Sequence, residues 1–137
     1  MKYIAAIVMM MCLMSTCIAA DEYADLDIVS TLLISSYSSG IYQPDFDISR
    51  GSTKLDYVSL STTEDDVLTD IAAVLVVYSM MVEDSPEIGD LEVIVKTVMG
   101  KEVAAYRCDK NWVKGDLNDR EQVRELSMKV LDTLTVL

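Results

Sequence analysis

The segment from residue 64 to 84 constrains the fold more than any other part of the sequence, because it predicts one long helix that is apolar on most sides. Thr63 precedes three acids, Glu64 to Asp66, which is the order of a hydroxyl cap followed by charges that complement a helix N-terminus. One apolar stripe comprises Val67, Ile71, Val74, Leu75, Tyr78 and Val82. A helix with so little polar surface is buried, so we expect it inside a layered domain.

Two β-hairpin patterns flank this helix. Residues 45–49 alternate between apolar and polar side chains, residues 50–52 supply a turn, and residues 54–61 return. Residues 91–98 and 101–108 form the second pattern around Met99-Gly100. Further helices are predicted over residues 25–38 and from Asn118, which has capping-box spacing to Glu121. The predicted fold class is α+β: an antiparallel β-sheet built from two hairpins, packed against helices in the order α-ββ-α-ββ-α.

The first 20 residues have the features of a secretory signal sequence. Lys2 is followed by an apolar run over residues 3–14 and then by small residues up to Ala20. The run is shorter than the roughly 20 residues needed to cross a bilayer, although an uncleaved N-terminal anchor is the alternative. We therefore expect a signal sequence over 1–20, a single α+β domain over 21–137, and a location outside the cell or in the cell envelope.

Cys17 is a candidate lipidation site at the end of this leader. A lipid on Cys17 would tether the domain to the membrane as a lipid-anchored surface protein. The preceding residues 13–16, Leu-Met-Ser-Thr, match a lipoprotein box poorly, which favours ordinary cleavage near Ala20. Membrane contact is expected only through the leader or through this lipid.

The charge and composition exclude several classes of function. The formal net charge is −12, which repels phosphate backbones, so nucleic acid is not an expected partner. The chain contains no histidine, which excludes Ser-His-Asp, Cys-His and His-zinc chemistry. The five glycines are scattered and form no phosphate-binding loop, and no cofactor is expected. Carboxylates are abundant, so a carboxylate-dependent hydrolase is the alternative to a non-catalytic domain.

One group of acids has the spacing of a calcium loop. Asp45, Asp47, Ser49 and Asp56 occupy its first, third, fifth and twelfth positions. Arg50 stands where the loop requires glycine, and Asp replaces the final Glu. The sequence therefore favours outward strand residues over a metal site.

Cys108 is the only cysteine outside the leader. We expect it to be buried or half-buried in the final strand of the second hairpin and not to act as a nucleophile, because no histidine can accept its proton. An outward thiol would instead be free to join two domains as a homodimer.

Residues 62–112 carry a resemblance to a known group of proteins. The capped helix, the connection Pro86-Glu87-Ile88-Gly89-Asp90-Leu91 and the closing run from Tyr106 to Trp112 are similar to small exported α+β proteins of methanogenic archaea, a group without an assigned activity. The resemblance implies export and a shared α+β core, and it supplies no catalytic residue. The sequence favours a small exported, non-catalytic binding or cell-envelope-associated domain, with no catalytic residue assigned.

Overall fold

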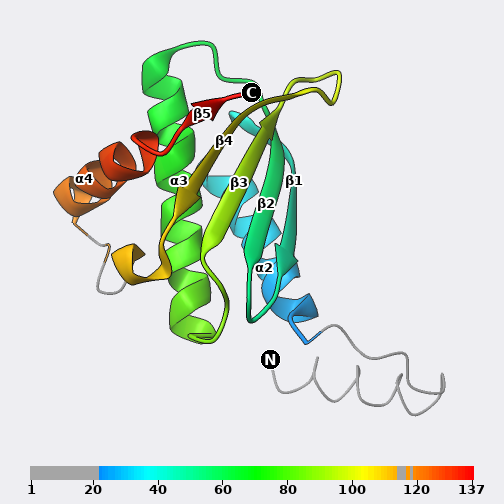
Figure 1. Ribbon diagram of the computed structural model, residues 1–137, viewed down its shortest axis with the longest axis vertical. Helices are drawn as coiled ribbons and strands as arrows, with labels where there is room; N and C mark the ends of the chain where they lie inside the picture. Colours follow the sequence, from blue (N-terminus) through cyan, green and yellow to red (C-terminus); the bar gives the residue numbers. More distant parts are fainter. Residues whose placement is uncertain (1–21, 114–116, 118) are drawn as a thin grey trace.

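The computed structural model describes residues 22–113, 117 and 119–137, which form an α+β fold (Figure 1). The predicted signal sequence and Cys17 lie outside these residues. The elements in chain order are α2 (Ala24–Tyr37), β1 (Ile41–Ile48), β2 (Thr53–Ser59), α3 (Glu64–Asp84), β3 (Leu91–Lys96), β4 (Glu102–Cys108), the 3₁₀ helix η1 (Lys110–Val113), α4 (Arg120–Leu131) and β5 (Thr135–Val136). This order confirms the predicted α-ββ-α-ββ-α fold.

The strands form one sheet in the order β1-β2-β3-β4-β5. Both predicted hairpins are present as antiparallel pairs, β1–β2 and β3–β4. The two hairpins meet through β2 and β3, which run parallel, with Leu55 opposite Val93. The sheet is therefore mixed and not wholly antiparallel as predicted. The reason is α3, which carries the chain back along the sheet before β3 begins, as in a β-α-β crossover.

The C-terminal part of the chain adds a strand that the sequence pattern did not predict. The short strand β5 pairs with β4, placing Ala104 opposite Val136. The cap of α4 is Asp119, whose Oδ1 accepts a hydrogen bond from the backbone N–H of Glu121 at 3.0 Å. The predicted cap, Asn118, lies outside the described residues. In contrast, Thr63 caps α3 as predicted, accepting a hydrogen bond from the N–H of Asp66.

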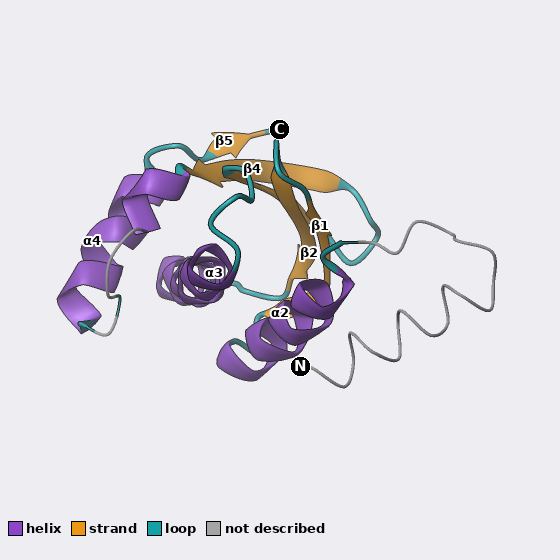
Figure 2. Ribbon diagram, turned by 90° about the horizontal axis from the view of Figure 1, so that it is seen from below, coloured by secondary structure: helices purple, strands orange, loops and turns teal. Residues whose placement is uncertain are grey.

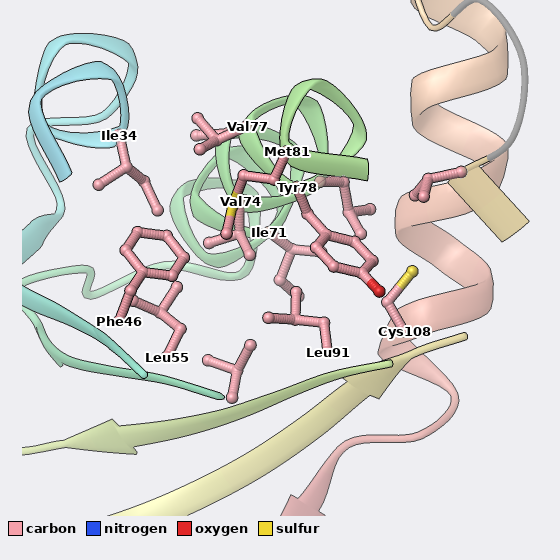
Figure 3. Close-up of a cluster of buried hydrophobic side chains, with 14 of the residues drawn as sticks. Ile34, Phe46, Leu55, Ile71, Val74, Val77, Tyr78, Met81, Leu91 and Cys108 are labelled. Atoms are coloured by element: carbon pink, nitrogen blue, oxygen red, sulfur yellow. The ribbon is translucent and has the colours of Figure 1, made fainter. Parts of the chain in front are cut away.

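The helices cover one face of the sheet, with α3 between α2 and α4 (Figure 2). The core lies between α3 and the sheet, and Figure 3 shows side chains from α3 meeting those of the strands. Leu55, Leu75, Leu91 and Val93 are all completely buried. No helix among the described residues is long and apolar enough to cross a membrane.

The β1 edge of the sheet is irregular. A β-bulge interrupts the β1–β2 ladder between Tyr42 and Asp45. Gln43, within the bulge, has a φ of 51°, in the left-handed region that residues other than glycine rarely adopt. Pro44 follows and has no backbone N–H to donate. The outer edge of the sheet therefore presents a broken row of hydrogen-bonding groups.

Candidate ligand-binding groove

A groove of about 540 Å³ lies between α3 and α4. Leu68 and Ala72 contribute apolar surface from the first half of α3, and Val123 and Met128 contribute it from α4. The groove is lined by Asp65, Leu68, Thr69, Ala72, Leu117, Arg120, Val123, Arg124, Ser127 and Met128. Its walls thus combine aliphatic side chains with two arginines.

The helix sequences explain why apolar side chains line this groove. The side of α3 that faces the sheet is filled by buried residues such as Leu75 and Tyr78. Because α3 is apolar on most sides, Leu68 and Ala72 remain on a second side and are only partly buried. On α4, Leu126 and Val130 are buried, and residues one turn earlier border the groove.

Arg120 and Arg124 are four residues apart on α4, so their side chains lie on the same side of the helix. Both residues are exposed. Within the part of the chain that the structure describes, the ion pairs are Arg50–Glu22 and Lys96–Asp56, and neither groove arginine belongs to one. Two guanidinium groups without carboxylate partners are notable in a chain with a net charge of −12.

The groove hydroxyls are already bonded to their own helices. The Oγ1 of Thr69 donates to the carbonyl of Asp65 at 2.9 Å, and the Oγ of Ser127 donates to the carbonyl of Val123 at 2.7 Å. The charged groups that line the groove are therefore the guanidinium groups of Arg120 and Arg124 and the carboxylate of Asp65. This arrangement can accept an anionic group beside an apolar one, because guanidinium binds carboxylate and phosphate in a bidentate manner.

A second, smaller pocket of about 270 Å³ lies near the N-terminal part of α3 and is mostly polar. Asp70 is only 2% exposed, although it carries a carboxylate. Its Oδ1 accepts a hydrogen bond from the Oγ of Ser38 at 2.5 Å, and its Oδ2 accepts one from the Oγ of Ser61. Gly40 packs against the same group, since a Cβ at this position would lie 2.5 Å from Oδ1 of Asp70. Because both carboxylate oxygens are bonded, the arrangement joins the segments before β1 and after β2 to α3.

The calcium candidates lie on neighbouring strands and not around a loop. Asp45 on β1 lies opposite Asp56 on β2, and Asp47 lies opposite Lys54. The carboxylate of Asp56 accepts a hydrogen bond from Nζ of Lys96 at 3.1 Å. Ser49 lies in the turn, where its Oγ donates to the carbonyl of Ser52. Among the described residues, no three acidic, Cys or His side chains are grouped so that they could hold a metal ion.

Cys108 ends β4 and its side chain is completely buried. Burial raises the pKa of its thiol to about 12, and the negative charges of Asp109 and Asp90 contribute in the same direction. Tyr78 lies beside it in the core (Figure 3), and its hydroxyl donates to the carbonyl of Gly89 at 2.8 Å. A thiol with so high a pKa contains almost no thiolate at neutral pH.

Two aromatic residues near Cys108 have different surroundings. Tyr106 is buried, and its hydroxyl is hydrogen-bonded to that of Tyr57 at 3.0 Å. Burial raises the pKa values of both tyrosines. Trp112 is half-buried, and Nζ of Lys129 lies 4.4 Å from its ring centroid, in a cation–π contact. Neither ring lines the α3–α4 groove.

Sequence reasoning missed the groove arginines and Asp70. Arg120 and Arg124 were assigned to a solvent face opposite the apolar stripe of the last helix, and a linear pattern does not show that α3 comes close to that side. Asp70 had a usable signal, since it follows Val67 by three residues and precedes Val74 by four. An acid on a buried stripe requires hydrogen-bond partners inside the protein.

Comparison with protein families gives one match. A model described as Domain of unknown function (DUF8159) matches residues 34–136, from the end of α2 to the last strand. Neither the curated proteins nor the solved structures include a match to this chain.

Proposed function

The chain belongs to the DUF8159 family of domains of unknown function, and we propose that it is a small exported, non-catalytic domain that binds an amphipathic anion in the α3–α4 groove. The ligand has an apolar chain or ring and a carboxylate or phosphate group. The apolar part contacts Leu68, Ala72 and Val123, and the anionic group binds Arg120 and Arg124.

The observation that carries this proposal is the pair of unpartnered arginines beside aliphatic side chains. Arginines that serve solubility alone are expected among acids in a chain with this charge, and Arg50 is paired in that way with Glu22. Arg120 and Arg124 instead border an apolar hollow. A guanidinium group near apolar surface binds an anion more strongly than one surrounded by water, because screening is weaker there.

The size of the groove supports a small ligand. Its volume of about 540 Å³ lies within the roughly 300–1,000 Å³ that is common for small-molecule sites. The groove is also open along its length between two helices, which suits an elongated ligand. Both helices present their N-terminal halves to the groove, so their dipoles add to its attraction for an anion.

Export is part of the proposal and is supported by the sequence. The leader-like pattern over residues 1–20 and the resemblance of residues 62–112 to small exported proteins of methanogenic archaea both favour it. In the cell envelope, amphipathic anions arise as free fatty acids, lipid fragments or lipid headgroups with short chains. Binding such molecules requires no catalytic group.

Calorimetry with dodecanoate as the probe tests the groove. We expect one site per chain, and we expect Arg120→Gln/Arg124→Gln to weaken binding at least about tenfold, because a charge-assisted hydrogen bond contributes about 1.5–3 kcal/mol. Dodecanol, which lacks the charge, should also bind at least about tenfold more weakly.

Two variants serve as controls. Arg107→Gln removes an exposed arginine on β4 that does not line the groove, and it should leave dodecanoate binding unchanged. Ala72→Phe places a ring in the groove and should reduce binding of both dodecanoate and dodecanol. Equal affinity of the wild type and the double arginine variant for dodecanoate would refute the proposed function.

A further inference from the structure

The outward side of α2 is apolar and uncovered. Ser30 and Ile34 are the fully buried residues of this helix, and they face the rest of the domain. On the other side, Ile28 is 60% exposed and Leu32, one turn later, is 67% exposed, with Val29 beside them. A surface helix normally presents polar side chains to water, so an apolar stripe here points to something that covers it.

The position of α2 in the chain indicates what lies nearby. It begins at Ala24, seven residues after Cys17 and ten after Met14, the end of the apolar run. Seven residues span at most about 25 Å and ten at most about 36 Å when fully extended. If the apolar run or a lipid on Cys17 enters a membrane, α2 is the helix nearest to the lipid surface.

The small area of the stripe argues against a second protein copy as the occupant. A stable protein interface uses roughly 20–30 residues from each partner, whereas this stripe offers three exposed apolar side chains. A tether to the membrane removes that requirement, because it holds the helix at a high local concentration next to the lipid. Weak burial of a few side chains then suffices for contact.

The charges near α2 indicate which lipids fit. The helix carries Asp25 and Asp27 and no basic residue, and the whole chain has a net charge of −12. Arg50 at this end is bonded to Glu22 at 2.7 Å. Anionic headgroups would therefore be repelled, whereas zwitterionic or uncharged headgroups would not.

We infer that α2 rests on a lipid surface through Ile28, Val29 and Leu32, with the domain held there by its N-terminal segment. This contact would extend the membrane association beyond the leader and into the folded domain. The inference rests on the export part of the proposed function and not on the groove, so the two can fail separately.

Fluorescence quenching by bromine-labelled lipid tests the contact directly. The full chain contains one tryptophan, Trp112, so Trp112→Phe provides a dark background. Leu32→Trp in that background, reconstituted in vesicles of phosphatidylcholine with brominated acyl chains, should be quenched at least twofold. Met99→Trp is the matched control, because Met99 is 92% exposed at the β3–β4 turn, far along the chain from α2. Its fluorescence should be quenched little.

Further arms decide between the outcomes. Ile28→Gln/Leu32→Gln, with Val29→Trp as the reporter, should restore most of the fluorescence, and vesicles of phosphatidylglycerol should quench Leu32→Trp less than phosphatidylcholine vesicles do. Equal quenching at positions 32 and 99 would overturn the inference. So would a Leu32→Trp signal that is shielded from iodide but not quenched by brominated lipid, because that pattern indicates a protein dimer. Dodecanoate binding measured on the same variants should remain unchanged.

Discussion

The hydroxyl of Ser38 lies 2.5 Å from Oδ1 of Asp70, so the residue that ends α2 is bonded to a carboxylate in the first half of α3. The hydroxyl of Ser61, which follows β2, is bonded to the other oxygen of the same carboxylate. One buried side chain thus holds together three segments that are distant in sequence. Two variants examine this arrangement.

Asp70→Ala should lower the free energy of unfolding by about 2–4 kcal/mol, because it leaves two hydroxyl groups without their acceptor. Asp70→Asn keeps one carbonyl oxygen and should lose less. Urea denaturation followed by circular dichroism measures both. A loss below about 0.5 kcal/mol for Asp70→Ala would mean that water replaces the carboxylate without cost.

Gly40→Ala should be destabilising by about 1–3 kcal/mol, since the added methyl group would meet the Asp70 carboxylate and the Ser61 hydroxyl at 2.5 Å. The cost should shrink when Asp70→Ala is also present, because the obstructing carboxylate is then absent. Gly51→Ala is the matched control, as its Cβ would meet no atom within 4 Å. Strict additivity of Gly40→Ala and Asp70→Ala would contradict the observed packing.

Tyr57→Phe should cost about 1–2 kcal/mol, because the buried hydroxyl of Tyr106 then loses its partner at 3.0 Å. Replacing both tyrosines by phenylalanine removes the unpaired hydroxyl along with its partner. The double variant should therefore be destabilised by less than the sum of the two single changes. Chemical denaturation of the four proteins gives this coupling, and a coupling of zero would argue against the hydrogen bond.

Cys108 should make stability fall at alkaline pH. Its pKa is about 12 in the folded protein against an ordinary value of 9.0, so the folded state keeps the proton that the unfolded state releases. This contribution is complete below pH 9 and is lost as the pH rises toward 12, at up to about 1.4 kcal/mol per pH unit. Tyrosines with raised pKa values act similarly above pH 10, so the measured quantity is the difference between the wild type and Cys108→Ala. The difference should change between pH 9 and 12 and stay constant between pH 6 and 8.

At neutral pH the same thiol should react slowly with alkylating reagents, since it is buried and protonated. The mature chain, recovered and run on a non-reducing gel, should migrate as a monomer. A dimer band that disappears on reduction, and also in Cys108→Ser, would show instead that the thiol reaches the surface.

Much of the secondary structure could be predicted because each element has its own local pattern. Thr63 before three acids located the start of α3, and alternation around Met99-Gly100 located the second hairpin. The parallel pairing of β2 with β3 was missed because the hairpins were considered separately from the helix between them. The short strand β5 has too few residues to show a period.

The candidate groove could not be predicted because it depends on which helix faces approach each other. Arg120 and Arg124 look like ordinary solvent-facing residues along the sequence, and only the position of α3 beside α4 gives them apolar neighbours. The acids of the calcium-like spacing were easier to judge. The alternation that makes Asp45 and Asp47 outward strand residues is visible in the sequence itself.

The interrupted edge strand has a consequence for the behaviour of many copies in a confined space. Identical open edges would allow one molecule to extend the sheet of the next and so to begin a fibril. The left-handed Gln43, the bulge and the missing N–H of Pro44 leave no long straight ladder on β1 to be copied. A protein that accumulates outside the cytoplasm, beyond the reach of the cytoplasmic chaperones, would thereby carry its own barrier to polymerisation.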